Sequence, residues 1–490
     1  MTPGTGAHSL RRMHPDEFRR HAHDVVDWMA DYLRDVGNLP VTPALVPGDV
    51  RRQLHGEPPG QGEPFDALFD DFRRIIVPGM THWNHPGWLA YFPCNNSPPS
   101  ILGEMLTAAM GAQGMSWATS PAATELEQTV MDWLRQMLGL PGTFTGVIQD
   151  TASTATLVAL LTARERATGH ASGTHGMAGG PRLTVYASRE AHSSVDKAVK
   201  LAGYGLDHLR HIPTDAAFAM QTDALERSIA ADRAAGLTPA CVVASIGTTS
   251  STAIDPLSDI AAICRRERLW LHVDAAYAGT AAIVPELRAP FAGAEHADSF
   301  VFNPHKWMLT NFDCTAYFVR DTGALLRTFE ASPEYLRTTH DPEVVNYRDW
   351  GIQLGRRFRA LKLWFVIRSY GVEGLRAMVR EHVSIARELA GWIGTRDDFE
   401  VMAPVPFGLV CFRYRPKGTT ETELDPLNQR LLERVNATKR FHMTHTRLGG
   451  RYAIRIVVGQ RTTTRAHVEA VWREIQEAAA VISSASSGRR

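Results

Sequence analysis

A carboxylate stands directly after one of the apolar segments of this 490-residue chain. Asp274 ends the run 270–273 and is followed by the small residues Ala275 and Ala276. In open α/β sheets, ligands bind outside the carboxyl ends of the strands. The position of Asp274 therefore predicts a ligand-binding carboxylate, although by itself it is explained equally well as a helix cap or a turn residue.

A lysine occupies the corresponding place after the next apolar segment. The run 299–302 leads through Asn303 to Lys306, which lies between His305 and Trp307. Most lysines are solvated surface residues, but an apolar setting lowers the pKa of an amine and makes it a better nucleophile at neutral pH. Lys306 is therefore predicted to be a desolvated, reactive amine on a strand next to that of Asp274.

A lysine and a carboxylate at adjacent strand ends are the two groups that pyridoxal 5′-phosphate (PLP) requires. The lysine binds the cofactor covalently. The carboxylate keeps the pyridine nitrogen protonated, so that the ring accepts the electrons released by bond cleavage. Lys306 and Asp274 match these two roles, and the pair predicts a PLP site.

Two further features fit around such a cofactor. Residues 146–153 include small and hydroxyl side chains and precede an apolar helical pattern. A helix N-terminus of this kind binds phosphate through its free N–H groups and its dipole, although it is an ordinary N-cap more often than a phosphate site. His192 follows a predicted strand and has the chemistry to stack on the ring or to act as an acid or base. One histidine among 20 carries little weight by itself.

The elements that must hold these residues fall into three stretches. Before residue 95, apolar residues at helical spacing predict amphipathic helices interrupted by prolines. From 96 to 345, short β-branched runs alternate with helical patterns, as in a parallel sheet with crossover helices. Beyond 346, a smaller α+β domain is predicted. The predicted strands are 183–186, 241–246, 270–273, 300–302, 408–414 and 452–458; the predicted helices include 65–76, 358–370 and 465–482; and 168–181 is predicted to be a surface loop.

The composition favours a small-molecule enzyme. Lys plus Arg and Asp plus Glu both number 52, so no net charge would draw the chain to nucleic acid or to an anionic membrane. No stretch reaches the roughly 18 to 20 apolar residues that span a bilayer, and the N-terminus does not read as a signal peptide. The five cysteines lack the spacing of a zinc site or a redox dithiol. We therefore expect a soluble, cytoplasmic protein without a bound metal.

Several motifs together resemble one family of PLP enzymes. The segments 272–279 (HVDAAYAG) and 303–307 (NPHKW) are similar to those of the group II PLP-dependent decarboxylases, which include the aromatic L-amino-acid decarboxylases. Further similar segments follow in the same order, so that the resemblance extends over nearly the whole chain; they lie at 81–83, 116–127, 354–358 and 408–412. Motifs in a common order are far more specific than any single motif.

The resemblance implies a fold, an assembly and a reaction. The implied fold is α/β, PLP fold type I (aspartate-aminotransferase-like), with an N-terminal helical arm (1–95), a large PLP-binding domain (96–345) with a mostly parallel seven-stranded sheet, and a small C-terminal α+β domain (346–490). The implied assembly is a homodimer with the active site at the subunit interface and the arm packed on the partner. The implied reaction is decarboxylation of an aromatic L-amino acid (tryptophan, phenylalanine, tyrosine or DOPA) to the arylalkylamine and CO2.

The resemblance also assigns roles to individual residues. Lys306 carries the cofactor, Asp274 binds the ring nitrogen, and His192 stacks on the ring. Tyr335, on a loop from about 329 to 345 that closes over the substrate, protonates the substrate carbon with the help of His192. The remaining cofactor contacts are Ala152, Ser153, Thr249, Asn303 and His305, and the substrate pocket contains Phe92, Cys94, Gln113 and Met115 together with His192.

This chain departs from the family pattern at two places. Asp150 and Thr154 replace the Gly and Glu that are common around the phosphate turn. In the substrate pocket, Cys94 stands where animal enzymes usually carry Thr, while Gln113 and Met115 replace Ile and Phe. We therefore expect an unsubstituted or indolic ring, as in phenylalanine or tryptophan, to compete well with the catechol of DOPA.

Two alternatives remain open. An aromatic aldehyde synthase shares the fold and the cofactor, but there oxygen attacks the carbon from which CO2 has left. Such synthases commonly lack either the loop tyrosine or the active-site histidine, so Tyr335 and His192 favour the decarboxylase. The alternative from another class is a catalytically silent PLP-binding scaffold, against which the intact Lys306 and Asp274 argue; an aminotransferase fits the motifs less well.

Overall fold

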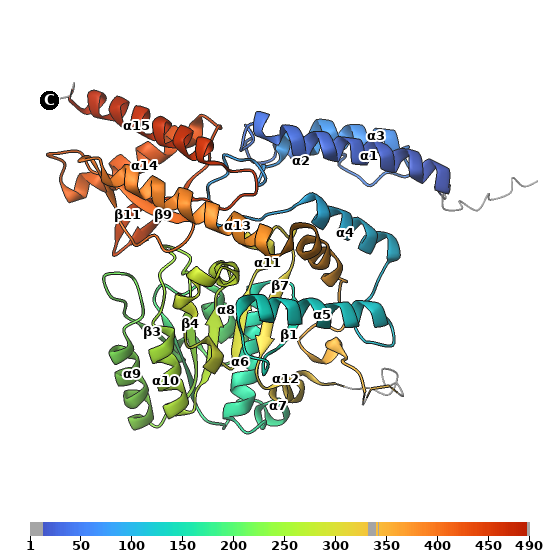
Figure 1. The fold of residues 1–490 in the computed structure, drawn as a ribbon, viewed down its shortest axis with the longest axis vertical. Coiled ribbons are helices and arrows are strands. Elements are labelled where there is room, and N and C mark those ends of the chain that lie inside the picture. Colours follow the sequence, from blue (N-terminus) through green and yellow to red (C-terminus); the bar gives the residue numbers. More distant parts are fainter. Residues whose placement is uncertain (1–12, 332–339, 342, 488–490) are drawn as a thin grey trace, which may run out of the picture.

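The computed structural model describes residues 13–331, 340–341 and 343–487. Figure 1 shows a large sheet flanked by helices in the lower part of the molecule and a smaller sheet with its own helices above it. A helical arm formed by α1 (Pro15–Asp35), α2 (Asp49–Gln53) and α3 (Phe65–Asp71) extends to one side. All five cysteines are free, and no helix in the described ranges is long and apolar enough to cross a membrane.

The central sheet has seven strands in the order β1-β7-β6-β5-β4-β2-β3. Five neighbouring strands, β6, β5, β4, β2 and β3, are parallel, whereas β7 runs antiparallel to both β1 and β6. The predicted mostly parallel sheet is thus confirmed. In chain order the strands are β1 (Thr145–Gln149), β2 (Leu183–Ser188), β3 (Leu209–Ile212), β4 (Thr238–Ser245), β5 (Trp270–Asp274), β6 (Ser299–Phe302) and β7 (Thr315–Val319).

Apolar side chains cover both faces of this sheet, which explains why its strands read as continuous apolar runs. Val242 and Val273 pack into one core, while Val243 and Trp270 pack into the core on the opposite face. The first core is covered by α5 (Pro121–Leu138), α9 (Thr222–Ala234), α10 (Leu257–Glu267) and α13 (Ala360–Gly394), and the second by α6 (Ala152–Ala167), α8 (Ser194–Leu201) and α12 (Thr322–Phe329).

The C-terminal part forms an antiparallel sheet of four strands in the order β10-β11-β9-β8. A separate apolar core joins it to its helices. α13 changes direction at Gly371, whose φ of 65° is readily adopted only by glycine. The strands are β8 (Phe399–Val401), β9 (Leu409–Tyr414), β10 (Thr444–Leu448) and β11 (Arg451–Val457), and the helices are α14 (Glu421–Ala437) and α15 (Arg465–Ser487).

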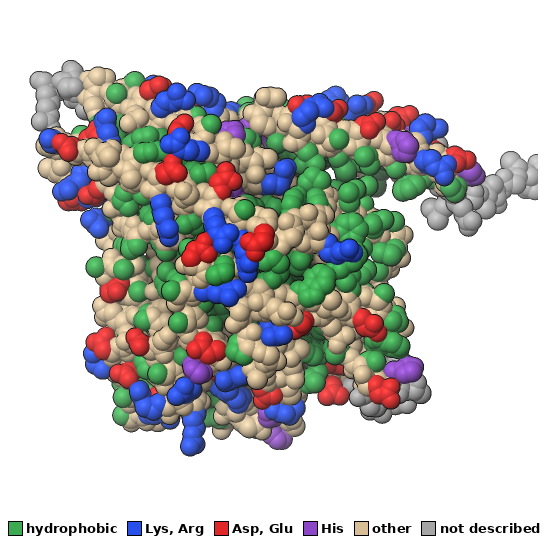
Figure 2. All heavy atoms as spheres, viewed as in Figure 1, with side chains coloured by type: hydrophobic (Ala, Val, Ile, Leu, Met, Phe, Trp, Pro, Cys, Tyr) green, Lys and Arg blue, Asp and Glu red, His purple; other side chains and the backbone are tan. Residues whose placement is uncertain are grey.

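The helical arm has an apolar side that the rest of the chain does not cover. Phe18 and Leu68 are 61% and 51% exposed, and on the neighbouring α4 (Pro98–Met110) Leu102 and Met110 are 52% and 58% exposed. Figure 2 shows hydrophobic side chains gathered beneath the arm and over the adjoining surface. Single exposed apolar residues are normal, but a contiguous group of this size is typical of an interface.

The structure extends several predicted elements and changes two. The helix at 65–76 divides into α3 and a π-helical turn at Phe72–Ile76. The predicted surface loop 168–181 contains the short helix α7 (Ser172–His175), because the buried Glu165 accepts hydrogen bonds from the Ser172 hydroxyl at 2.6 Å and the Gly173 N–H at 3.0 Å. The domain limits at 95 and 345 stay a prediction, as does the cytoplasmic location.

Candidate active site

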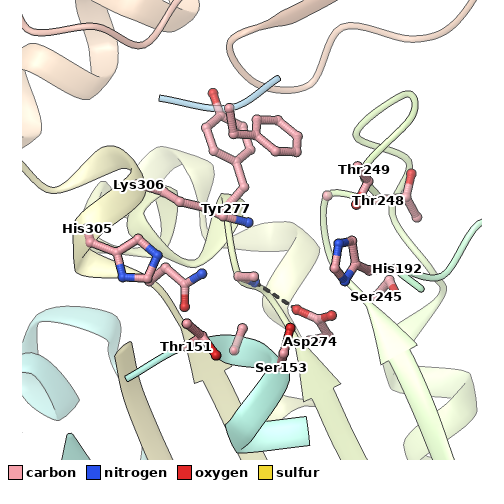
Figure 3. A pocket seen from close by; sticks show the side chains of 15 residues that line it. Thr151, Ser153, His192, Ser245, Thr248, Thr249, Asp274, Tyr277, His305 and Lys306 are labelled. Carbon is pink, nitrogen blue, oxygen red and sulfur yellow. Dashed lines mark hydrogen bonds between the residues drawn. The ribbon is translucent and has the colours of Figure 1, made fainter. Parts of the chain in front are cut away.

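The carboxyl ends of β4, β5 and β6 and the first turn of α6 surround one cavity of about 210 Å³ (Figure 3). This is the sheet edge at which the sequence predicted a ligand. The structure thereby brings together residues from distant parts of the chain. Of the predicted site residues, Phe92, Ala152, Ser153, His192, Thr249, Asp274, Asn303, His305 and Lys306 line this cavity.

Asp274 is the last residue of β5 and is held by both neighbouring strands. It pairs with Ser245 at the end of β4 and with Val301 of β6. Its Oδ1 accepts a hydrogen bond from the Ala276 N–H at 3.0 Å, drawn as the dashed line in Figure 3. Within the described residues, its other oxygen has no hydrogen-bond partner. Because Asp274 lines the cavity, this oxygen is free to accept a hydrogen bond from a ligand nitrogen.

Lys306 belongs to the single turn α11 (Pro304–Trp307), which follows β6. Its N–H donates to the Asn303 carbonyl at 2.9 Å, so the turn fixes where the side chain starts. The Lys306 Nζ lies 5.3 Å from the centre of the Phe92 ring. Burial lowers the pKa of Lys306 and the charge of Asp274 opposes this shift. The predicted desolvated amine is therefore present, and it reaches its reactive neutral form more readily than a surface lysine.

The first turn of α6 presents free N–H donors to the cavity. Thr151 is the N-cap, and its hydroxyl accepts a hydrogen bond from the Thr154 N–H at 3.3 Å. Ala152 and Ser153 are the first two residues of the helix, so their N–H groups have no partner inside it. Because both residues line the cavity, these N–H groups and the helix dipole favour a bound anion there.

Asn303 adds a side-chain donor beside this turn. Its Oδ1 accepts a hydrogen bond from the Thr315 hydroxyl at 2.9 Å, which leaves the amide NH2 for the cavity. The nearby Asp150 is turned elsewhere. Its carboxylate accepts hydrogen bonds from the Thr151 N–H at 2.6 Å and from the Gln353 side chain at 3.2 Å.

His192 lines the same cavity and lies close to Asp274 in Figure 3. Its Nδ1 accepts a hydrogen bond from the Ser194 N–H at 3.2 Å, which places the proton of the neutral ring on Nε2. Desolvation lowers the pKa of His192, while the charge of Asp274 opposes this and that of Lys306 adds to it. The ring is therefore neutral at pH 7 and suited to stacking on an aromatic cofactor.

His305 is a second neutral histidine in the wall. Its Nδ1 accepts a hydrogen bond from the Cys314 N–H at 3.0 Å, so its proton also lies on Nε2. Burial, reinforced by the charge of Lys306, lowers the pKa of His305 to about 3. His305 therefore contributes a hydrogen-bond donor without adding a positive charge.

An aromatic stack lies beside Lys306. Tyr277 packs between Phe92, with ring centres 4.0 Å apart, and Trp307, with ring centres 4.7 Å apart. Tyr277 is fully buried. In the sequence this tyrosine is only one residue of the motif 272–279, yet its contacts fix Phe92 and the residue next to Lys306.

The loop after β4 carries Thr249 and is fastened by a residue that sequence reasoning missed. Arg455 of β11 donates hydrogen bonds to the carbonyl oxygens of Thr249 at 2.7 Å and Ser250 at 3.0 Å. Arg455 is buried, and burial lowers the pKa of its guanidinium. In the part of the chain that the structure describes, it forms no ion pair with a carboxylate. The signal that could have found it is a single arginine inside the apolar run 452–458.

A larger cavity of about 750 Å³ adjoins the first and shares Lys306 with it. Cys94 lines this cavity, and burial raises the pKa of its thiol, although the charge of Lys362 opposes the shift. A neutral thiol and aromatic rings suit an apolar substrate ring. The aromatic residues of its wall are Tyr32, Trp83, Tyr91, Phe92 and Phe312.

Two predicted substrate residues lie apart from both cavities within one chain. The Gln113 side-chain oxygen accepts a hydrogen bond from the Arg356 N–H at 2.7 Å, and the Met115 carbonyl accepts one from the Arg348 N–H at 2.8 Å. Neither residue is in the lining of the two cavities. Tyr335, the predicted proton donor, lies outside the described residues.

Comparison with known proteins identifies the group to which this arrangement belongs. Residues 47–415 match the model of the pyridoxal-dependent decarboxylase conserved domain. The chain belongs to the pyridoxal-dependent decarboxylase family. It is a PLP-dependent carboxy-lyase of fold type I, as the sequence motifs predicted. The donor set fits the cofactor, with an amine, a carboxylate oxygen for the ring nitrogen, and N–H donors at a helix N-terminus for the phosphate.

Individual relatives agree over nearly their full length. The chain is 45% identical to the aromatic-L-amino-acid decarboxylase of Bos taurus over 489 residues, covering 96% of this chain and 97% of the relative. It is 41% identical to the phenylacetaldehyde synthase of Arabidopsis thaliana, covering 96% and 98%. The crystal structure of Oryza sativa TDC with PLP and tryptamine superimposes with a TM-score of 0.94 at 41% identity, covering 97% of this chain and all of that one.

Proposed function

We propose that this enzyme decarboxylates an aromatic L-amino acid to the corresponding arylalkylamine and CO2. The observation that carries the proposal is the position of Lys306 and Asp274 at adjacent strand ends, beneath a cavity walled by aromatic side chains. The similarity to the bovine decarboxylase and to a solved structure with tryptamine supports an aromatic substrate.

The main residues of the smaller cavity each have a task in this proposal. Lys306 would hold the cofactor through its amine, and the free oxygen of Asp274 would keep the ring nitrogen protonated. PLP, when bound, supplies the electron sink for the charge left on the substrate Cα as CO2 departs. His192 would stack on the ring. Ala152, Ser153 and Asn303 would bind the phosphate, with Thr249 and His305 as further cofactor contacts.

Tyr335 decides between the two candidate reactions. We propose that its phenol, assisted by His192, protonates the substrate Cα after CO2 has left. In an aldehyde synthase, oxygen attacks the same carbon, and a relative of that name is 41% identical to this chain. Closure of the loop that carries Tyr335 would keep water and oxygen out during this step.

The decisive experiment incubates the purified, PLP-saturated enzyme with tryptophan, phenylalanine, tyrosine and DOPA in separate reactions. Amine and CO2 in equal amounts are the expected products. We expect tryptophan or phenylalanine to compete well with DOPA because Cys94 and the apolar rings provide no dedicated catechol contact. Aldehyde, ammonia and hydrogen peroxide as the main wild-type products would replace this proposal with the synthase, and a bound cofactor without turnover would favour the scaffold.

Tyr335→Phe tests the proton donor. The variant keeps the ring but removes the proton, so it should form less amine and release aldehyde, ammonia and peroxide while PLP stays bound. Amine formation at the wild-type rate would show that another group protonates Cα.

We also propose that the enzyme is a homodimer with the active site at the subunit interface. The exposed apolar side of the arm and of α4, with Phe18, Leu68, Leu102 and Met110, supports this assembly (Figure 2). A dimer would also explain why Met115 lies apart from Lys306 within one chain, because Met115 of each chain would then line the cavity of its partner.

Hybrid dimers test this arrangement. Lys306→Ala and Met115→Arg chains, each inactive alone, are mixed and allowed to exchange subunits. If Met115 serves the partner's cavity, each hybrid contains one wild-type site, and activity returns to at most half of the wild-type value. If Met115 serves its own chain, neither site is intact and activity does not return. A monomer mass by light scattering would refute the dimer itself.

A further inference from the structure

A third cavity, of about 450 Å³, lies at the opposite edge of the central sheet from Lys306. It is bounded by the end of α6, the end of α10, the start of β5 and β6 and the end of β7. None of its lining residues lines the smaller cavity around Lys306 and Asp274, here called the PLP cavity. Its charged and polar wall contains Arg166, Arg265, Arg268, Arg320, His296 and Asp298.

Asp298 holds two of these arginines in place. Its Oδ1 accepts hydrogen bonds from Arg166 at 2.9 Å and Arg320 at 3.0 Å, while its Oδ2 accepts the Leu271 N–H at 2.8 Å. The Arg166 guanidinium also stacks over Trp270, 4.7 Å from its ring centre. The side chains of Arg166 and Arg320 are 37% and 38% exposed, so their remaining N–H groups are accessible to a ligand in the cavity.

The other two arginines lack a carboxylate partner within the described residues. Two neighbouring arginines do form ion pairs: Arg266 pairs with Glu226 at 2.7 Å, and Arg233 pairs with Glu267 at 3.4 Å. Arg265 and Arg268 have no such pair and are exposed. Arg268 is also the C-cap of α10 at a φ of 59°, where glycine is the usual residue.

The charge balance of this cavity is strongly positive. Four arginines face one buried carboxylate, and His296 has its own partner in Glu295 at 3.8 Å. The C-terminal ends of α6 and α10 contribute only about −0.5 elementary charge each, which does not offset the excess. Guanidinium groups bind phosphate oxygens in pairs, and converging arginines suit an anion with several such oxygens.

We propose that this cavity binds a small anion that carries two or more phosphate groups, either an inorganic oligophosphate or the phosphate chain of a nucleotide. The Trp270 ring is fully buried and covered by Arg166, so it offers no platform for a base. We therefore expect the arginines to recognise the phosphate chain. A ligand here would sit at the start of β5 and β6, one strand length from Asp274 and Asn303.

The test is isothermal titration of the PLP-saturated enzyme with tripolyphosphate and, separately, with ADP, at constant ionic strength. Saturation with PLP keeps the anions away from the N–H donors at the N-terminus of α6, where the cofactor phosphate is expected to bind. We expect saturable binding of tripolyphosphate that weakens at least about tenfold in Arg265→Ala/Arg268→Ala, because charge-assisted contacts are lost. ADP and pyrophosphate, titrated under the same conditions, should bind with similar affinity, because the base is not recognised.

A matched double variant controls for net charge. Arg227→Ala/Arg266→Ala removes two exposed arginines that pair with Asp223 and Glu226, and it should bind tripolyphosphate as the wild type does. Absence of saturable binding by the wild type, equal affinity in the Arg265/Arg268 variant, or equal loss in the control variant would each overturn the proposal. The PLP absorbance of every variant verifies that the fold is intact.

Discussion

Replacing Arg455 tests whether the small C-terminal sheet holds the loop after β4, which carries Thr249, in place. Arg455→Met keeps a long side chain of similar shape but removes the donors to the Thr249 and Ser250 carbonyls. Thr249 lines the PLP cavity, so a loosened loop should first be noticed as weaker cofactor binding. Arg455 also donates a hydrogen bond, at 3.1 Å, to the hydroxyl of Thr444, which belongs to β10 of the small sheet.

The size of the effect follows from two opposing contributions. Each charge-assisted hydrogen bond to a carbonyl contributes about 1.5 to 3 kcal/mol, and two such bonds are lost at 2.7 and 3.0 Å. Burying a guanidinium without a carboxylate costs part of that gain, as the lowered pKa of Arg455 indicates. A net loss of about 2 kcal/mol remains, which corresponds to a roughly thirtyfold weaker Kd for PLP if loop order is required for binding.

The assay is equilibrium titration of the apoenzyme with PLP, followed by absorbance and protein fluorescence. Arg413→Met is the matched control, because Arg413 is an equally buried arginine of the same sheet that pairs with Glu400 and Glu421 instead of the loop. Both variants should unfold at lower temperature, but only Arg455→Met should lose PLP affinity. Equal PLP affinity in the two variants would refute the reasoning.

Three further predictions concern the PLP cavity. Lys306→Ala should lose turnover and the absorbance of lysine-bound PLP, and borohydride reduction of the wild type followed by peptide mapping should find the cofactor on Lys306 and on no other lysine. Asp274→Asn should lose several powers of ten in decarboxylation rate, since a neutral amide does not hold the ring nitrogen protonated and about 1.4 kcal/mol is a factor of ten; near-normal rates would contradict the role. The lowered pKa of His192 means that its ring stays neutral to a lower pH than an ordinary histidine. Any fall of kcat/KM that depends on His192 should therefore have its midpoint below about 6.5, and a midpoint above that value that disappears in His192→Gln would contradict the assignment.

Much of the site could be predicted from local sequence. Asp274 and Lys306 each follow a short apolar run. β5 does end at Asp274, and β6 ends at Phe302, just before the turn that carries Lys306. A strand buried on both faces leaves a local signature of consecutive apolar residues, and a ligand site begins where that signature stops. The N-terminus of α6 was predicted in the same way, from small and hydroxyl residues ahead of an apolar helix.

Other features depended on contacts between distant segments and left little local signal. β7 reads like any buried strand, and only its pairing with β1 and β6 makes it antiparallel. Arg455 reaches the loop of Thr249 from another sheet. Met115 stands at a position where the family has a substrate residue, but within one chain it lies apart from the cavity of Lys306. The four arginines of the cavity beside Asp298 come from α6, from the end of α10 and from the end of β7. Sequence alone determined which residues carry chemistry, because residue type and strand end are local properties; tertiary structure decided which of them meet, because proximity between distant segments is set by packing.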